Sequence, residues 1–148
     1  MTQHLTERQI ERQITDYLAL DNWRCIKTDP VSDRARGKGF GELGMADCLY
    51  LRYRPIPYEV HVDGPVPDLP PGNFGYFAPV VPCQAEVMFI EHKRPGQKPK
   101  QHQLRWHEAE RACGALTLIA GVDFEASLDG FMAWYKTSGL MRRRIGAK

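Results

Sequence analysis

The sequence predicts an α/β fold, and three observations support that class. Segments with helical apolar spacing lie near both ends of the chain. Short apolar runs of strand length lie between them and end at Gly or Pro. The chain of 148 residues is 43% hydrophobic and 26% charged, as is usual for a globular protein of one domain. We therefore expect three or four strands in mixed pairing, flanked by helices.

The first part of the chain predicts one helix and two strands. Thr6 can cap a helix over residues 6–20. The apolar residues that recur on one face of this helix are Ile10, Ile14, Tyr17 and Leu18. Residues 23–28 alternate like a first strand, and residues 44–51 read as a turn that leads into a second strand. Asp47 stands at the start of the second strand, where it either caps the turn or serves chemistry, because aspartate is a poor strand residue.

Prolines are concentrated in one segment. Residues 54–82 hold eight of the eleven prolines. This segment is too short for a core of its own, so we expect an insertion between the second and third core strands. The expected organisation is a single domain over residues 1–148, with a basic tail at residues 141–148.

The remaining chain predicts a strand, a helix, a strand and a final helix. Residues 85–90 form a buried strand, and a helix follows from about Lys100 to Cys113. The side chains of this helix that we expect to pack inward are Trp106, Ala109 and Cys113. Residues 115–120 predict another buried strand. Asp123 is expected to cap the last helix.

A carboxylate and an ammonium group follow the strand at residues 85–90. Glu91 and Lys93 are two residues apart, so they project on the same face of an extended chain. With a second carboxylate nearby, such a pair can hold a divalent cation and a reacting water. The alternative is an ordinary solvated ion pair, and the rest of the sequence has to decide between them.

Several motifs taken together resemble one nuclease family. They are Gly44-Met45-Ala46-Asp47, Ile90-Glu91-His92-Lys93-Arg94-Pro95-Gly96, Gln103 with Gly114 eleven residues later, and Glu7 before the apolar stripe. This set resembles the PD-(D/E)xK nuclease superfamily, and within it the stand-alone phage or bacterial type of VRR-NUC (virus-type replication-repair nuclease) domain. The resemblance covers nearly the whole chain except the insertion, and Ala46 stands where the family commonly has proline. It implies a restriction-endonuclease-like core of order α-β-β-β-α-β.

The resemblance also implies roles for individual residues. The implied catalytic residues are Glu7, Asp47, Glu91, Lys93 and Gln103. Mg²⁺ or Mn²⁺ would be bound by Asp47, Glu91 and the backbone carbonyl of His92, with Glu7 as a further candidate ligand. Lys93 would orient or deprotonate the attacking water, and Gln103 would position the water or a phosphate. Glu11 is the alternative to Glu7 as the carboxylate of the first helix.

Basic residues near these motifs are candidate contacts to DNA phosphates. They are Arg34, Arg36, Lys38, Arg94, Lys98 and Lys100. The net charge is only +2, so the distribution of charge has to carry this assignment. Each cluster can also be an ordinary solvated surface.

The resemblance implies a metal-dependent endodeoxyribonuclease that cuts branched DNA, with Holliday (four-way) junction resolution by a homodimer as the leading expectation. A flap or other structure-specific nuclease, a restriction-like nuclease, and a catalytically silent DNA-binding module are the alternatives. The four cysteines include no Cys-x-x-Cys pair and predict neither a zinc site nor a disulfide framework. No run of about 18 apolar residues and no signal peptide is evident, so we expect no membrane span and a cytoplasmic, bacterial or phage-encoded protein.

Overall fold

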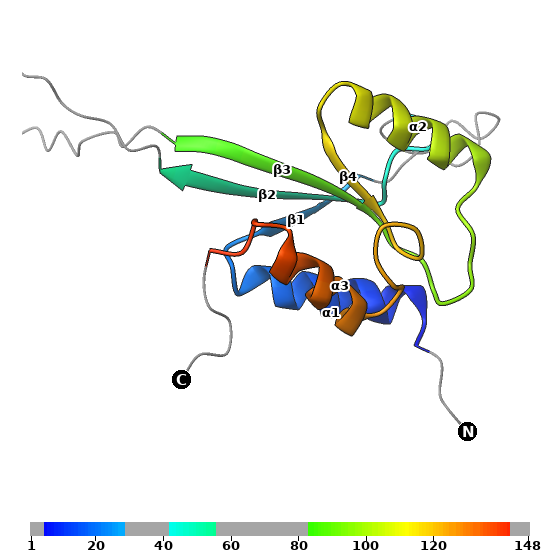
Figure 1. Ribbon diagram of the computed structural model, residues 1–148, viewed down its shortest axis with the longest axis horizontal. Helices are drawn as coiled ribbons and strands as arrows, with labels where there is room; N and C mark the ends of the chain where they lie inside the picture. Colours follow the sequence, from blue (N-terminus) through cyan, green and yellow to red (C-terminus); the bar gives the residue numbers. More distant parts are fainter. Residues whose placement is uncertain (1–4, 29–41, 56–82, 143–148) are drawn as a thin grey trace, which may run out of the picture. The chain divides into compact units, whose positions relative to one another are not determined.

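The protein has a mixed α/β fold with seven regular elements in the parts that the structure describes (Figure 1). The computed structural model describes residues 5–28, 42–55 and 83–142. In chain order the elements are α1 (Glu7–Ala19), β1 (Arg24–Lys27), β2 (Cys48–Pro55), β3 (Cys83–Glu91), α2 (Gln101–Ala112), β4 (Leu116–Ile119) and α3 (Leu128–Thr137). The predicted class and element order are confirmed. The predicted insertion, apart from its first two residues, and the tail beyond residue 142 lie outside the described residues.

The chain divides into two compact units. The main unit combines residues Met1–Arg52 with Val87–Lys148, and the second unit is Tyr53–Glu86. All elements that bear on the candidate site belong to the main unit, although β2 and β3 both continue into the second unit. No helix within the described segments is both long and apolar enough to cross a membrane.

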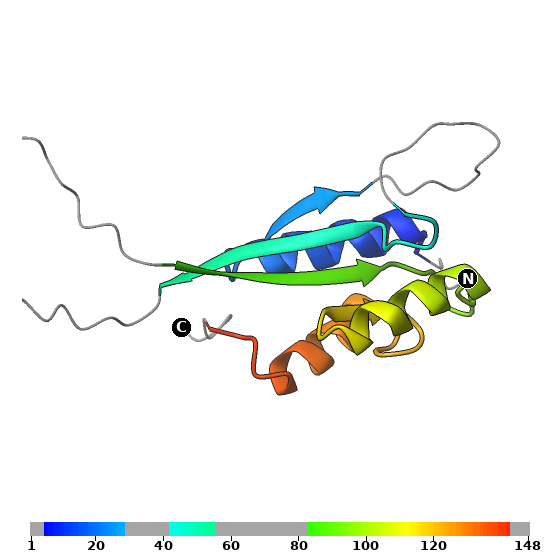
Figure 2. The ribbon, with the colours of Figure 1, turned by 90° about the horizontal axis from the view of Figure 1, so that it is seen from above.

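One four-stranded mixed sheet organises the main unit. The strand order is β1-β2-β3-β4, and Figure 2 shows β1, β2 and β3 from above. β1 and β2 pair antiparallel, with Cys25 opposite Tyr50. β3 and β4 pair parallel, with Glu91 opposite Ile119. The chain passes through α2 between β3 and β4, because two parallel strands cannot be joined by a tight turn and need a crossover connection.

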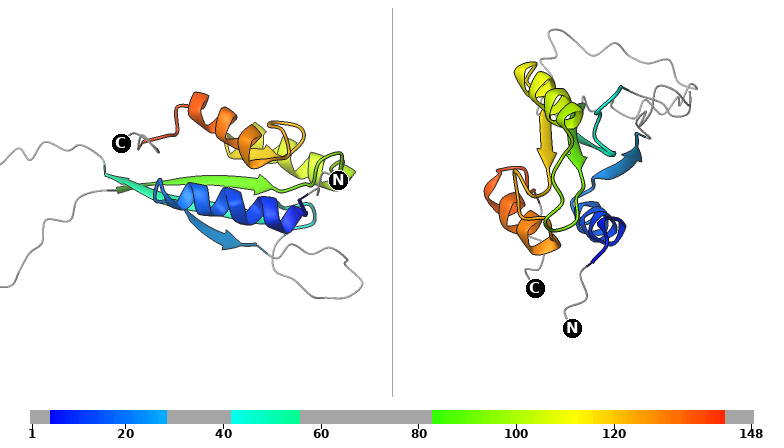
Figure 3. Two further views of the ribbon diagram at one scale, coloured as in Figure 1. Left: turned by 90° about the horizontal axis from the view of Figure 1, so that it is seen from below. Right: turned by 90° about the vertical axis from the view of Figure 1, so that its right-hand side faces the viewer.

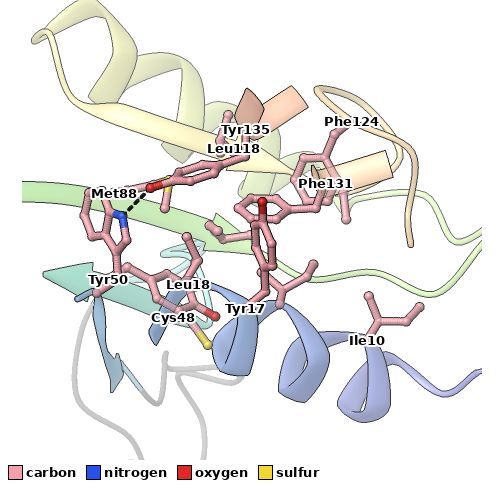
Figure 4. Packing of buried hydrophobic residues seen from close by; sticks show 14 of the residues in the cluster. Ile10, Tyr17, Leu18, Cys48, Tyr50, Met88, Leu118, Phe124, Phe131 and Tyr135 are labelled. Carbon is pink, nitrogen blue, oxygen red and sulfur yellow. Dashed lines mark hydrogen bonds between the residues drawn. The ribbon is translucent and has the colours of Figure 1, made fainter. Parts of the chain in front are cut away.

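The helices cover the two faces of the sheet unequally. α1 and α3 lie on one face, and α2 lies on the other face beside β3 and β4 (Figures 1 and 3). The main core fills the space between the sheet and the α1–α3 layer (Figure 4). The large side chains that are fully buried there include Ile10, Ile14, Leu18, Tyr50, Met88, Ile90, Phe131 and Tyr135. The predicted apolar stripe of the first helix is therefore confirmed.

Two local predictions about helices need correction. Asp123 does not cap α3: its carboxylate accepts a hydrogen bond from Ile119 N at 2.7 Å and pairs with Arg111. Ser127 caps α3 instead, because its hydroxyl accepts a hydrogen bond from Gly130 N at 3.0 Å. On α2, Trp106 is buried as expected, but Ala109 and Cys113 are exposed.

The buried side of α2 is rotated relative to the prediction. Its buried residues are Trp106 and His107, which stack edge to face with ring centroids 5.1 Å apart. Trp106 also packs edge to face on Phe89 of β3, at 5.3 Å. The stripe of α2 is weak in the sequence, because charged and amide side chains surround it on all sides.

A buried ion pair joins the end of α1 to β2 and α3. Arg52 Nη1 donates to Asp21 Oδ2 at 2.6 Å, and both side chains are at most 2% exposed. Tyr135 OH donates to the same carboxylate oxygen at 2.6 Å, and Trp23 Nε1 donates to Tyr135 OH at 2.8 Å. The guanidinium carbon of Arg52 lies 4.3 Å from the centre of the Trp23 ring. These bonds satisfy charges that would otherwise be costly to bury.

Replacing Arg52 by Met should lower the free energy of unfolding by about 3–5 kcal/mol, because Asp21 would stay buried without its cation. Urea unfolding measures the change. Arg12→Met is the matched control, since Arg12 lies 3.9 Å from Asp16 and the two side chains are 85% and 74% exposed. The control should leave stability almost unchanged. Equal effects of the two substitutions would contradict the importance of the buried pair.

Candidate active site

The end of β3 sends alternate side chains to opposite faces of the sheet. Met88 and Ile90 enter the core beneath α1 and α3, and His92 continues that series with 0% exposure. Glu91 and Lys93 belong to the other series and are 0% and 5% exposed. Their common direction, predicted from the two-residue spacing, places both among the residues that line one pocket.

The second carboxylate comes from the turn before β2. Asp47 directly precedes Cys48, the first residue of β2, and Cys48 is itself in the core. Thr28 holds this turn twice, through its backbone N–H to Asp47 O at 3.2 Å and through its hydroxyl to Ala46 O. Asp47 is therefore fixed at the start of the strand and lines the same pocket as Glu91.

Gly44 lets the turn approach the first turn of α2. Its φ is +90°, in the region that favours glycine, and a Cβ atom added there would lie only 2.7 Å from the carbonyl carbon of His102. On the other side of the same turn, Glu42 Oε2 accepts a hydrogen bond from Trp106 Nε1 at 3.1 Å. The turn that carries Asp47 is thus held against the helix that carries Gln103.

These elements enclose a pocket of about 250 Å³. It is lined by Glu7, Gly44, Met45, Asp47, Glu91, Lys93, Gln97, Lys100, His102 and Gln103. All five residues predicted as catalytic are in this set. Gln97 and His102 were not predicted, because they belong to no motif and meet the pocket only through the path of the chain around the start of α2.

The two oxygens of Glu91 have different environments. Oε1 accepts hydrogen bonds from Lys93 Nζ and from Gln103 Nε2. Oε2 is buried and has no hydrogen-bond partner among the described residues. The Gln103 amide oxygen accepts from Lys100 N at 2.9 Å. Gln103 therefore bridges the start of α2 to Glu91, a contact that its predicted role with water or phosphate did not include.

The environment of the pocket disfavours the ionised forms of its carboxyl groups. Burial, followed by repulsion from Asp47, raises the pKa of Glu91 to about 7, although Lys93 opposes this shift. Burial also raises the pKa of Asp47, against the attraction of Lys93 and Lys27. A buried and a half-buried carboxylate whose ionised forms disfavour each other are suited to bind a cation, which would relieve both effects.

The donor set fits a hard divalent cation. Mg²⁺ prefers oxygen ligands and usually takes only one or two protein carboxylates, with water completing its coordination. Asp47 and Glu91 offer two such groups, and Glu91 Oε2 lacks another partner. Among residues 5–28, 42–55 and 83–142, no cluster of three or more His, Cys, Asp or Glu side chains could hold a metal. This arrangement does not suit a closed zinc site with four protein ligands.

The structure separates the two candidates for the first-helix carboxylate. Glu7 lines the pocket with Asp47 and Glu91. Glu11 lies one turn further along α1 and forms an ion pair with Lys27 of β1. Glu7 and Glu11 both line a second hollow of about 690 Å³ formed by residues of α1 and β1, but Glu11 does not line the pocket of Asp47 and Glu91. The position of Glu7 therefore favours it over Glu11 as the third carboxylate.

The predicted DNA-binding residues are placed only in part. Lys100 lines the pocket, and Arg94 lines an adjoining hollow of about 430 Å³ that shares Glu7 and Gln97 with it. Lys98 is exposed in the connection between β3 and α2. Arg34, Arg36 and Lys38 lie outside the described residues.

Comparisons with known proteins find no match for this chain among family models, curated proteins or solved structures. The assignment of a function therefore depends on the residues of the site and on their chemistry.

Gly44→Ala should separate the Asp47 turn from α2, because the new methyl group would collide with the backbone of His102. The expected loss is more than about 2 kcal/mol of stability, with a change in tryptophan fluorescence as the Trp106–Glu42 bond breaks. Gly96→Ala is the matched control, because Gly96 has φ +79° but no atom near its added Cβ. It should lose only about 1 kcal/mol of stability and keep the fluorescence. Equal effects would contradict a close approach at Gly44.

His107 should make the protein sensitive to acid. Burial, with a smaller effect from Arg111, lowers the pKa of His107 to about 4, whereas Asp123 opposes this and Lys93 assists it. A depressed histidine pKa means that stability is complete above the unfolded value of about 6.5 and is lost as the pH falls towards 4.

The free energy of unfolding in urea, measured from pH 7.5 to 4.5, tests this effect. The wild type should lose on the order of 2 kcal/mol more than His107→Leu over that range. His92, whose pKa burial also lowers to about 3, contributes equally to both proteins and cancels in the comparison. Identical pH profiles would contradict a neutral, buried His107.

Proposed function

We propose that this protein is a Mg²⁺- or Mn²⁺-dependent endonuclease that hydrolyses phosphodiester bonds in DNA. One observation carries the proposal. Asp47 and Glu91 converge with Lys93 on one polar pocket, and a buried oxygen of Glu91 has no partner there. This is the arrangement that the PD-(D/E)xK resemblance implies, and it supports a restriction-endonuclease-like reading of the sheet with α1 and α2.

The chemistry follows from the residues. Asp47 and Glu91 would hold the cation, with the backbone carbonyl of His92 as the third protein ligand implied by the resemblance. A bound divalent cation supplies positive charge that offsets the negative charge developing on the phosphate and the leaving oxygen. Glu7, which also lines the pocket, can accept a hydrogen bond from a water molecule or help to bind a second cation.

Lys93 supplies the third functional group. In the metal-free protein its ammonium group neutralises Glu91 through Oε1. Lys93 also lines the pocket, where its ammonium group would orient the attacking water and contact the phosphate. Gln103 holds Glu91 Oε1 independently of Lys93, because its own amide oxygen accepts a hydrogen bond from Lys100 N. Lys93 thereby orients the nucleophile and stabilises the charge that forms on the phosphate.

The surroundings of the pocket favour an anionic substrate. Arg94 and Lys100 stand at its margin, and both are exposed. Basic side chains around a cation site position a phosphodiester backbone without reading its sequence. Branched DNA, in particular a four-way junction, is the substrate that we propose from the resemblance to small stand-alone members of the family. Two copies of the chain would then make the two cuts that symmetric incision requires.

Cleavage of labelled DNA tests the proposal. Four-way junction, flap, duplex and single-stranded substrates are incubated with Mg²⁺ or Mn²⁺, and with EDTA as the metal-free control. Asp47→Asn and Glu91→Gln should each lower the cleavage rate at least about a hundredfold, because each removes a charged ligand and keeps its shape. Glu7→Gln should lower the rate less, and Glu11→Gln, whose side chain pairs with Lys27 and does not line the pocket, should have a smaller effect than Glu7→Gln.

The outcomes separate the proposal from its alternatives. Paired symmetric cuts in the junction, lost in EDTA and in Glu91→Gln, would support junction resolution. Metal-dependent cutting of flaps or duplex alone would keep the nuclease and remove the junction as its substrate. A folded protein that binds DNA but cuts nothing would overturn the proposed activity in favour of a silent DNA-binding module.

A further inference from the structure

A row of hydrogen-bonded side chains lies behind the candidate site. Thr15 Oγ1 is 2.8 Å from Tyr50 OH, and Tyr50 OH is 3.1 Å from His92 Nε2. The rings of Tyr50 and His92 meet edge to face, with centroids 6.2 Å apart. The row connects α1, β2 and the residue that follows β3, on the core side of the sheet.

This polar row is unusual for its location. Tyr50 and His92 are both 0% exposed and lie beside the apolar core that Figure 4 shows around Tyr50. Apolar side chains of similar size would fill this space without the penalty of burying polar atoms. His92 Nδ1 has no hydrogen-bond partner among the described residues, so the row is not even fully satisfied. Packing alone does not explain a tyrosine and a histidine at these positions.

The chain connectivity relates the row to the site. Tyr50 is on the strand that Asp47 precedes, and His92 stands between Glu91 and Lys93. The Tyr50–His92 bond therefore links, from behind, the two chain segments that carry the carboxylates. It also fixes the His92 side chain on the core face, so that its neighbours in sequence must leave on the pocket face.

We propose that Tyr50 and His92 are positioning residues that set the spacing of Asp47 and Glu91 for one divalent cation. The inference rests on the proposed metal-dependent function and deepens it. Neither side chain faces the pocket, so their effect passes through the backbone of β2 and of the segment after β3. Groups that orient metal ligands in this indirect way commonly change metal affinity by about 10- to 100-fold.

Calorimetric titration of Mn²⁺ into the DNA-free protein tests the proposal without any cleavage. Tyr50→Phe removes one hydroxyl and keeps the ring, and it should weaken Mn²⁺ binding about tenfold. His92→Leu should weaken it similarly, and the double variant should be no worse than either single variant, because both remove the same bond. His92→Gln, which can still bond to the Tyr50 hydroxyl, should recover part of the affinity.

Thr15→Val is the matched control. It removes the hydrogen bond between Thr15 and the same hydroxyl and leaves Tyr50–His92 in place. We expect it to lower the melting temperature of the metal-free protein, by less than Tyr50→Phe does because one bond of the row remains, with Mn²⁺ affinity kept within about twofold of wild type. A purely structural role would change melting temperature and leave the affinity of every variant unchanged.

Two failures are distinguishable. If the wild type binds Mn²⁺ and cuts DNA but Tyr50→Phe and His92→Leu bind Mn²⁺ equally well, the positioning role is overturned and the proposed nuclease stands. If the folded wild type binds no Mn²⁺ and cuts nothing, the metal site itself is wrong, and the positioning role falls with it.

Discussion

The alternation of side chains at the end of β3 is the constraint on which the site depends. A strand has only two faces, so Ile90 and His92 can serve the core only if Glu91 and Lys93 serve the opposite side. A shift of one residue in register would exchange these roles and bury both charged groups in the α1–α3 core. The apolar core that stabilises the sheet therefore also fixes the direction of the chemical groups.

Because of that constraint, Glu91 lies in the same pocket as Asp47, and the two carboxylates repel each other when both are ionised. Asp47 and Glu91 are close enough for burial and mutual repulsion to raise the pKa of Glu91 to about 7. Lys93 and Gln103 compensate at one oxygen of Glu91 and leave the other without a partner. The Asp21–Arg52 pair shows the contrast, because its carboxylate oxygen has three donors and lies in a purely structural position. The oxygen of Glu91 that lacks a partner among the described residues is the feature on which the proposed cation site rests.

Short-range patterns were sufficient to predict the elements, and the family resemblance named five of the residues that line the pocket. The four-residue repeat of α1, the strands at β3 and β4 and the Glu-x-Lys spacing are all local, and each was confirmed as a structural feature. The predicted burial of residues 85–90 holds only at the end of that run, because Ala85 and Val87 are exposed. The wrong predictions concern the cap of α3, for which two residues were suitable, and the buried face of α2, for which the apolar pattern was weak. Asp123 and Ser127 are both good helix caps, and only the contact of Asp123 with Arg111 and Ile119 N decides between them. α2 is polar on every side, so its buried face is set by the Phe89 ring and not by its own periodicity.

The supporting contacts could not be read from the sequence at all. Position 44 must be a glycine because the backbone of His102, 58 residues later in the chain, leaves no room for a side chain. Tyr50 of β2 likewise forms a hydrogen bond with His92, 42 residues later. Such partners depend on where the sheet and α2 bring the chain, which no local pattern encodes. A motif names the residues that touch a ligand, whereas the residues that hold them at a workable spacing come from the whole fold. In this protein the second group includes Gly44 and Gln103, and the same reasoning extends it to Tyr50 and His92.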